Sequence, residues 1–246
     1  MTKLTAQGIY DALMEEKLLA QEGQIKFFLG GVDIIVKQKD VVGNIVQEWL
    51  QGWLDKHKVE YHTNENSQMP PDFFLEPNDH TCNLLEVKAF NRKASPGFDI
   101  ADFRMYEEEV IDKPYMLYVD YLIFGYDMSD EGVVTIKDLW LKKVWQITRR
   151  MDDWAINLQI KDKVVHKIRP GVWYSTSRQK FKMFTCLEHF LSALEETVYQ
   201  DPKTHNDAGS WRSKFLESYS NFYGEKLDIP RWQEIGESYI IKKNEN

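Results

Sequence analysis

The sequence predicts an α/β fold, because stretches with helical spacing and stretches with strand character both occur along the chain. Thr5 to Gln21 and Asp40 to Leu54 repeat apolar side chains at the spacing of an amphipathic helix. Tyr115 to Tyr126 (YMLYVDYLIFGY) is instead an almost continuous apolar run of strand-forming residues, as expected at the buried centre of a sheet. We therefore expect amphipathic helices together with a sheet that contains a buried central strand.

Length and composition favour one globular domain. The chain has 246 residues, of which 43% are hydrophobic and 13% aromatic, enough for a substantial core. We expect a single domain over residues 1–246, with a helical extension from about residue 183. Neither a signal peptide nor an apolar run long enough to cross a bilayer is visible, so we expect a cytoplasmic protein with no membrane partner. Cys82 and Cys186 lie in no paired metal spacing and should be reduced thiols.

The first 54 residues predict two helices separated by strand-forming residues. The first helix should end near Gly23. Ile25 to Val36 is dense in β-branched and aromatic residues and is interrupted by Gly30 and Gly31, so it predicts a strand or a small hairpin. Asp40 is expected to cap the second helix.

The most informative stretch runs from Pro70 to Lys88. Leu84 to Lys88 alternates in the manner of a strand, so Leu85 and Val87 should enter a core while Glu86 and Lys88 share the opposite face. Upstream, Asp72 precedes a short apolar run, Phe73 to Leu75, that also predicts a strand. Because the residues between the two runs are rich in turn formers, we expect a hairpin.

Such a hairpin would bring the carboxylates of Asp72 and Glu86 to the same end of the strand pair, with Lys88 close by. Magnesium prefers oxygen ligands and commonly uses only one or two protein carboxylates beside water and substrate phosphates. Lys88 could then hold or help to deprotonate an attacking water and stabilise charge in the transition state. The alternative is an edge hairpin whose Glu86 and Lys88 face solvent and could pair with each other.

The remainder of the chain predicts further helices and strands. Strand character is expected for Val133 to Ile136, and for Ala155 to Ile168 as strands or a hairpin. Helical spacing predicts four more helices, over Asp99 to Asp112, Asp138 to Met151, Phe184 to Tyr199 and Ser210 to Tyr223. In the first of these, Glu107 to Glu109 should face outward.

The charge distribution leaves room for a nucleic-acid partner. The net charge of −8 argues against one, because phosphate contacts need lysine and arginine. However, Lys137 to Lys182 contains twelve basic residues and four acids, a local excess of +8 that leaves −16 for the rest of the chain. One basic region within an acidic protein is typical of a DNA-binding surface, although a solvated charged surface is the alternative.

PPDFF followed by LLEVK resembles the active-site signature of the PD-(D/E)xK nuclease superfamily. The continuation AFNRKASPGFDIADF is most similar to type II restriction endonucleases of the NgoBV and NlaIV group. The resemblance implies a restriction-endonuclease-like core, namely a mixed central β-sheet flanked by helices, with the catalytic hairpin at its edge. It also implies that Asp72 and Glu86 bind Mg²⁺ and that Lys88 is the catalytic lysine. In many restriction enzymes an earlier helix points one acid at the metal, and Glu48 is the matching candidate here, although an exposed helix glutamate is an equal alternative.

The same resemblance implies an activity and its partners. The expected reaction is Mg²⁺-dependent hydrolysis of double-stranded DNA that leaves 5′-phosphate and 3′-hydroxyl ends. The target would be GGNNCC, the enzyme would be a homodimer, and a cognate DNA methyltransferase would protect host DNA. Two alternatives remain: a repair or structure-specific nuclease of the same superfamily, and a non-catalytic DNA-binding module.

Two polar segments are candidates for DNA contact. The loop after Lys88 leaves the catalytic strand beside the expected scissile phosphate, and Arg169 to Lys180 combines residue types that bind base edges and phosphates. Arg178 is the candidate for a base contact. The remaining candidates are Asn91, Arg92, Lys93 and Ser95 in the first segment, and Ser175, Ser177, Gln179 and Lys180 in the second. A purely structural loop is the alternative for both.

Overall fold

The computed structural model describes residues 2–65, 70–177 and 179–242. The chain groups into two compact units that interleave in sequence. The first comprises residues 1–98 and 119–142, and the second comprises residues 99–118 and 143–246. The expectation of a single domain over the whole chain stays a prediction. Among the described residues, no helix is long and apolar enough to cross a membrane.

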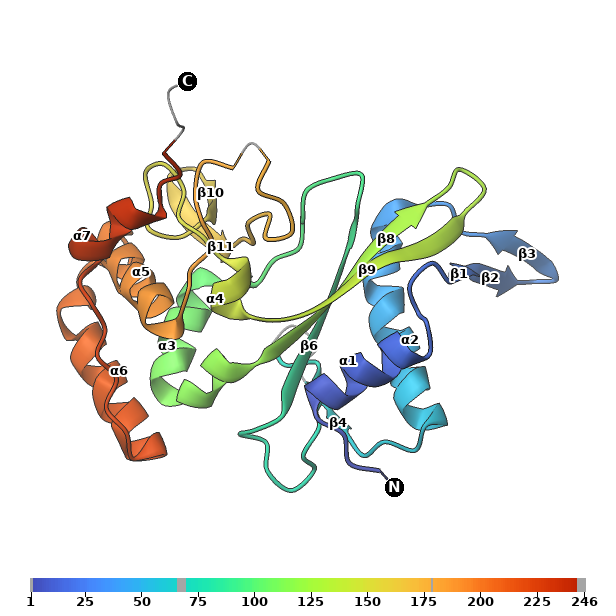
Figure 1. Ribbon diagram of the computed structural model, residues 1–246, viewed down its shortest axis with the longest axis horizontal. Coiled ribbons are helices and arrows are strands. Elements are labelled where there is room, and N and C mark those ends of the chain that lie inside the picture. The colour runs from blue at the N-terminus through green and yellow to red at the C-terminus, as the bar shows by residue number, and fades with distance from the viewer. Residues whose placement is uncertain (1, 66–69, 178, 243–246) are drawn as a thin grey trace. The chain divides into compact units, whose positions relative to one another are not determined.

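The first unit is built on a mixed six-stranded sheet (Figure 1). Its strands, in spatial order, are β1 (Glu22–Gln24), β9 (Val133–Lys143), β8 (Asp120–Met128), β6 (Leu84–Asn91), β5 (Phe73–Phe74) and β4 (His62–Thr63). Strands β6 and β8 are parallel, whereas β5 pairs with β6, β4 with β5, and β1 with β9 in antiparallel fashion. The predicted hairpin is confirmed as β5 and β6. We expected this hairpin at the edge of the sheet. That expectation is wrong for β6, which lies between β5 and β8 in the sheet.

Two helices cover one face of this sheet. Helix α1 (Ala6–Glu15) begins where the Thr5 side chain accepts a hydrogen bond from the Gly8 backbone N at 3.1 Å. It ends well before Gly23, because Lys17 adopts a left-handed conformation with φ of 57°. Helix α2 (Val42–Lys56) follows a 3₁₀ turn, η1 (Lys39–Val41). Asp40 lies inside that turn, so it does not cap α2 as predicted.

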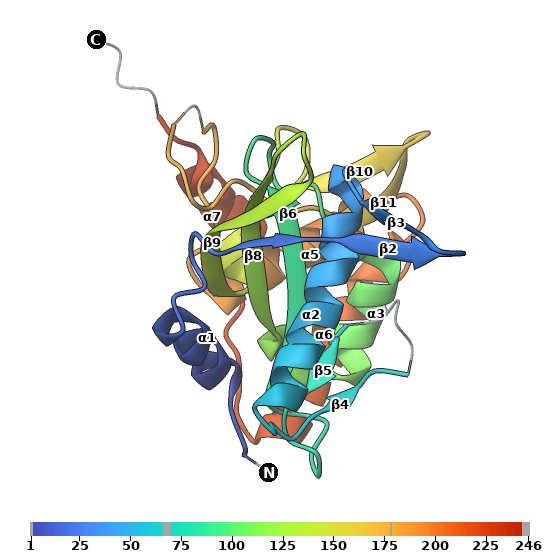
Figure 2. The ribbon, with the colours of Figure 1, turned by 90° about the vertical axis from the view of Figure 1, so that its right-hand side faces the viewer.

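The core of the first unit lies between these helices and the sheet. Strand register places Val87 beside Leu122, and both are buried together with Leu85 and Phe124. They pack in one apolar cluster with α1 and α2, and Figure 2 shows α2 running along the sheet. The prediction that Leu85 and Val87 enter a core is therefore confirmed.

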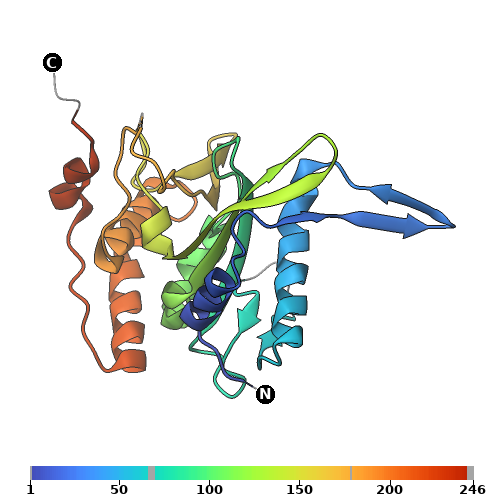
Figure 3. The same ribbon diagram turned by 45° about the vertical axis from the view of Figure 1, so that its right-hand side comes forward.

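A short hairpin projects from the first unit. It consists of β2 (Lys26–Leu29) and β3 (Val32–Ile35), joined by Gly30 and Gly31 with φ of 57° and 80°. Two consecutive positive φ angles suit a tight hairpin turn, and glycine adopts them without a steric penalty. Every residue of both strands is exposed, and Figure 3 shows the hairpin extending beyond α2. The hairpin alternative predicted for this segment is confirmed.

The second unit combines a small antiparallel sheet with most of the remaining helices. The sheet contains β10 (Leu158–Lys161), β11 (Val164–Ile168) and β7 (Ala101–Asp102), so the predicted strands between 155 and 168 are confirmed. The helices are α3 (Phe103–Asp112), α4 (Val144–Ile147), α5 (Leu187–Gln200), α6 (Ala208–Tyr223) and α7 (Trp232–Ile235), with 3₁₀ turns η2 (Pro114–Tyr118) and η3 (Gly236–Tyr239). The helices predicted near the C-terminus are confirmed as α5 and α6.

Three further local predictions are wrong. The helix predicted over Asp138 to Met151 is replaced by the continuation of β9 to Lys143 and by the short α4, because hydrogen bonding to β8 overrides the helical spacing. Strand β8 begins at Asp120, since residues 115–118 form η2. Glu107 is buried instead of exposed, and the indole of Trp211 donates to its backbone oxygen at 3.0 Å. Burial also raises the pKa of Glu107 to about 7.

Substitutions at two glycines should have opposite effects on stability. A Cβ atom on Gly125 of β8 would lie 2.7 Å from Arg92 Cδ and 2.9 Å from Trp140 Cζ3. Gly125→Ala should therefore lower the free energy of unfolding by about 1 to 3 kcal/mol. Gly52→Ala, in an open position on α2, should raise it by roughly 0.5 to 1 kcal/mol. Urea denaturation of both variants tests this packing, and equal effects would contradict it.

Candidate active site

The β5–β6 pair brings two carboxylates together. Phe73 pairs with Leu85, and extending this register by one residue places Asp72 opposite Glu86. Asp72 Oδ2 also accepts a hydrogen bond from the Val87 backbone N at 2.7 Å, which fixes Asp72 to the strand that carries Glu86. The expectation that the hairpin gathers these two acids agrees with this geometry.

Lys88 lies beside Glu86 on the same strand. Its Nζ is 2.6 Å from Glu86 Oε1, an ion pair between side chains that share one face of β6. Glu86 is buried, so the alternative of a solvent-facing glutamate is wrong. The other carboxylate oxygen of Glu86, Oε2, is buried and has no hydrogen-bond partner among the described residues. Because a buried carboxylate oxygen without a partner is costly, Oε2 needs a cation or a donor.

Helix α2 supplies a residue that the sequence did not single out. Gln47 Nε2 donates a hydrogen bond to Asp72 Oδ1 at 2.8 Å. Glu48, the predicted acid of this helix, is instead exposed. Gln47 could have been recognised from its spacing, because it precedes the buried Leu50 and Leu54 by three and seven positions and so lies on the apolar stripe of α2.

The electrostatics of the pair favour a bound cation. Burial and the neighbouring charge of Glu86 raise the pKa of Asp72 to about 7, although the Val87 N–H and Lys88 oppose this rise. Two carboxylates thus lie close together, and the positive charge that acts on Asp72 from the described part of the chain is the ammonium of Lys88. A divalent cation between them would stabilise both ionised forms.

The donor set fits magnesium. Among the described residues, no group of three or more His, Cys, Asp or Glu side chains could hold a metal ion, so the protein offers two carboxylates at this position. Magnesium is commonly held by one or two carboxylates, with water and phosphate oxygens completing its coordination. Zinc would be expected to have more protein ligands, including nitrogen or sulfur.

The loop after β6 contains the first group of predicted DNA contacts. Arg92 is engaged within the protein, because its Nε donates to Asp138 Oδ2 at 2.5 Å and its guanidinium lies 5.3 Å from the Trp140 ring centroid. Asn91 Oδ1 accepts from the Lys93 backbone N at 2.9 Å. Lys93 and Ser95 are exposed. The DNA-binding roles of these residues stay predictions.

The second predicted contact segment lies in the second unit. The Gln179 side chain donates to the backbone oxygens of Val172 and Ser175, and Lys180 pairs with Asp152, so both residues have contacts within the protein. Ser175 Oγ accepts from the Ser177 backbone N at 3.2 Å. Arg178, the predicted base contact, lies outside the described residues. The DNA-binding roles of this group also stay predictions.

Comparison with known proteins identifies the family. The sequence matches the NgoBV restriction endonuclease family over residues 3–239. It is 67% identical to type II restriction enzyme NlaIV of Neisseria lactamica over 98% of this chain and 100% of the relative. It is 65% identical to type II restriction enzyme NgoBV of Neisseria gonorrhoeae over 65% of this chain and 92% of that relative. A solved structure of NlaIV restriction endonuclease matches with a TM-score of 0.94 at 66% identity, covering 98% of this chain and 99% of the other. The chain therefore belongs to the NgoBV restriction endonuclease family and is a type II restriction endonuclease.

Proposed function

We propose that this enzyme hydrolyses double-stranded DNA at a specific sequence in a magnesium-dependent reaction that leaves 5′-phosphate and 3′-hydroxyl ends. The observation that carries the proposal is the pair of adjacent carboxylates, Asp72 and Glu86, with Lys88 in contact with Glu86. The buried oxygen of Glu86 that has no partner among the described residues supports a cation at this point. The names of the NlaIV and NgoBV relatives support DNA as the substrate.

Asp72 and Glu86 would hold the magnesium ion, and Gln47 would hold Asp72 in place. Bound magnesium supplies positive charge that neutralises phosphate oxygens and lowers the pKa of a nearby water. The hydrogen bonds from the Gln47 amide and the Val87 N–H occupy one oxygen of Asp72 each. Oriented ligands of this kind reduce the rearrangement needed when a metal and a phosphate bind.

Lys88 would act on the attacking water and on the transition state. Water adds to phosphorus, the bond to the 3′-oxygen breaks, and the departing oxygen takes up a proton to become a hydroxyl. The ammonium of Lys88 is anchored by Glu86 at 2.6 Å, so it can donate hydrogen bonds to the water and to phosphate oxygens without leaving its position. Its charge stabilises the additional negative charge of the pentavalent transition state.

The proposed target is GGNNCC, and the proposed assembly is a homodimer. A two-fold symmetric protein matches a palindromic site and supplies one active site for each strand. In the proposed cytoplasmic setting, a cognate DNA methyltransferase would protect host DNA at the same sequence.

Digestion of a fully sequenced, unmethylated plasmid tests the proposal. Wild-type protein and Asp72→Ala are incubated with and without magnesium, and the fragment ends are sequenced. We expect discrete, magnesium-dependent ends at GGNNCC with 5′-phosphates, all lost in the variant. Random nicking would favour a less specific nuclease, and the absence of cleavage by folded wild-type protein would favour a non-catalytic DNA-binding module.

Lys88→Ala should reduce the single-turnover cleavage rate by about 10² to 10⁴-fold, because the ammonium acts in the chemical step. DNA affinity, measured by fluorescence anisotropy in calcium, should change only a few-fold. Lys93→Ala is the matched control, since Lys93 is an exposed lysine just beyond the same strand. Lys93→Ala should weaken DNA binding, whereas the single-turnover cleavage rate at saturating enzyme should change less. Full turnover by Lys88→Ala would remove Lys88 from the mechanism.

Gln47→Leu should raise the magnesium concentration for half-maximal cleavage about tenfold or more, because Asp72 loses the amide that orients it. Glu48→Gln is the adjacent control on the exposed side of α2 and should leave that concentration unchanged. A magnesium titration of single-turnover rates makes the comparison. A larger effect of Glu48→Gln than of Gln47→Leu would contradict this role of Gln47. It would support Glu48 as the metal-binding acid of α2 that the family resemblance implies.

Asp72→Asn should stabilise the metal-free protein at high pH. The folded state binds the Asp72 proton more tightly than the unfolded chain, since burial and Glu86 raise the pKa of Asp72 to about 7. The wild type thus loses stability as the pH rises from about 4 to about 7, whereas the variant does not. In chelator, the variant's gain in unfolding free energy should grow over this interval and level off at about 1 to 3 kcal/mol by pH 8. A gain that shrinks with rising pH would contradict this assignment.

A further inference from the structure

The hairpin β2–β3 has one wholly apolar face. Its register pairs Phe27 with Ile34 and Leu29 with Val32, and these alternate pairs point to the same side of the ribbon. All four side chains are between 52% and 71% exposed. The opposite face is mixed, because Lys26 and Asp33 lie there with Phe28 and Ile35.

The mixed face is the one that meets the rest of the first unit. A Cβ atom on Gly132, in the turn between β8 and β9, would lie 2.6 Å from Ile35 Cγ2, so this turn packs closely against Ile35. Ile35 is accordingly the least exposed apolar residue of the hairpin, at 37%. The wholly apolar face points elsewhere, and an apolar surface of this kind on a soluble protein commonly marks an interaction site.

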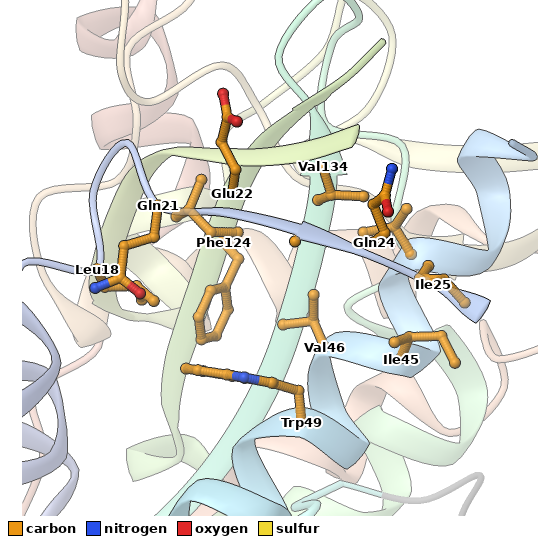
Figure 4. A pocket seen from close by; sticks show the side chains of 13 residues that line it. Leu18, Gln21, Glu22, Gln24, Ile25, Ile45, Val46, Trp49, Phe124 and Val134 are labelled. Atoms are coloured by element: carbon orange, nitrogen blue, oxygen red, sulfur yellow. The ribbon is translucent and has the colours of Figure 1, made fainter. Parts of the chain in front are cut away.

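An apolar hollow lies near the base of this hairpin. It has a volume of about 180 Å³ and lies where β1 passes α2, with lining residues from both elements and from β8 and β9 (Figure 4). The apolar side chains that surround it include Ile25, Ile45, Val46, Trp49, Phe124 and Val134. Ile45 and Trp49 remain 36% and 42% exposed on α2, and Trp49 packs edge-on against Phe124 at 6.1 Å. The hollow is several times the volume of one water molecule and can admit an apolar side chain.

We propose that a second copy of this chain covers both surfaces, with the apolar face of each β2–β3 hairpin seated on the Ile45 and Trp49 surface of its partner. The inference rests on the homodimer of the proposed function and names its interface. A two-fold interface must be self-complementary, and this unit carries both a projecting apolar face and an apolar hollow.

The area available approaches what a stable dimer needs. The four side chains of the apolar face, together with Ile45 and Trp49, present on the order of 600 Å² per copy. A stable protein–protein interface buries roughly 800 Å² per partner. Covering these two surfaces therefore accounts for most of the required area.

The chemistry of the hairpin favours protein over DNA as the occupant. The four residues of the apolar face carry no charge, whereas a DNA-contacting arm needs basic side chains for phosphates. Lys26 lies on the opposite face, opposite Ile35 and beside the pair of Phe28 with Asp33. Contact with DNA is an outcome that the test below separates.

The proposed interface also reaches the active site through α2. The same helix presents Ile45 and Trp49 to the hollow and Gln47 to Asp72. A partner hairpin seated on α2 would hold this helix against the sheet and so would hold the amide that orients Asp72. Monomeric variants should therefore need more magnesium for cleavage as well as lacking the second active site.

Leu29→Asp tests the interface, with Phe28→Asp as the matched control. The two residues are adjacent and similarly exposed, at 71% and 68%, but they lie on opposite faces of the ribbon. Each substitution occurs twice in a two-fold dimer, so Leu29→Asp should raise the dimer dissociation constant by about 100-fold or more. Phe28→Asp should change it only a few-fold. Analytical ultracentrifugation over a concentration series, without DNA or metal, compares each species with the monomer mass of 29.1 kDa.

A reciprocal cross-link makes the test independent of weakened association. Leu29→Cys and Ile45→Cys are prepared separately in a Cys82→Ser, Cys186→Ser background, then mixed and treated with a short bismaleimide. We expect the mixture to form more covalent dimer than either protein alone, while thermal unfolding confirms that every variant is folded.

Three results would overturn the proposal. These are a wild type that stays monomeric at every concentration, a Leu29→Asp variant that dimerises like the wild type, and a mixture that cross-links no better than its components. If Leu29→Asp keeps the wild-type dimer dissociation constant but binds DNA more weakly, the hairpin would be reassigned to DNA contact. Because mass is measured without substrate, failure of the interface is distinguishable from failure of the nuclease function.

Discussion

The repulsion between two adjacent carboxylates is the constraint around which the first unit is organised. Asp72, just before β5, lies near Glu86 of β6, and one oxygen of Glu86 is buried without a partner among the described residues. Such an arrangement is unfavourable in the isolated protein and becomes favourable when a divalent cation and a phosphate are present. The hydrogen bonds from Gln47 and Val87, and the ammonium of Lys88, hold the two acids in place against this repulsion.

The position of β6 in the sheet explains how that arrangement is kept rigid. β6 runs parallel to β8 from Leu85 to Asn91, whereas β5 pairs only with Leu84 and Leu85 on its other side. Just beyond that short pairing, the Asp72 carboxylate accepts from the Val87 backbone N, so the segment that carries Glu86 and Lys88 is held on both sides. Leu85 and Val87, on the opposite face, are buried with α1 and α2. The core packing of one face therefore fixes the reactive groups on the other, which is a common way to hold functional side chains at a fixed geometry.

Sequence patterns predicted the parts of the site that depend on local alternation, and missed the parts that depend on tertiary packing. Glu86 and Lys88 followed from period-two spacing between Leu84 and Lys88, and Asp72 followed from the short apolar run after it. The contact from Gln47 was missed, because the family resemblance favoured the adjacent acid, Glu48, although the apolar spacing of α2 places Gln47 toward the sheet. The apolar spacing of residues 138–143 predicted a helix, but pairing with β8 imposed a strand. Burial of Glu107 against Trp211 likewise depends on a helix more than one hundred residues away in the chain.

The most direct test of the central claim is to locate the cation. Crystals of the enzyme with a GGNNCC duplex and Mn²⁺, examined by anomalous diffraction, would show the metal position without relying on turnover. Our account predicts an ion bound by Asp72 and by Glu86 Oε2, which has no partner among the residues that the structure describes, with phosphate or water oxygens completing its shell. An ion held by other residues, or DNA bound in register with no cation at this carboxylate pair, would contradict it.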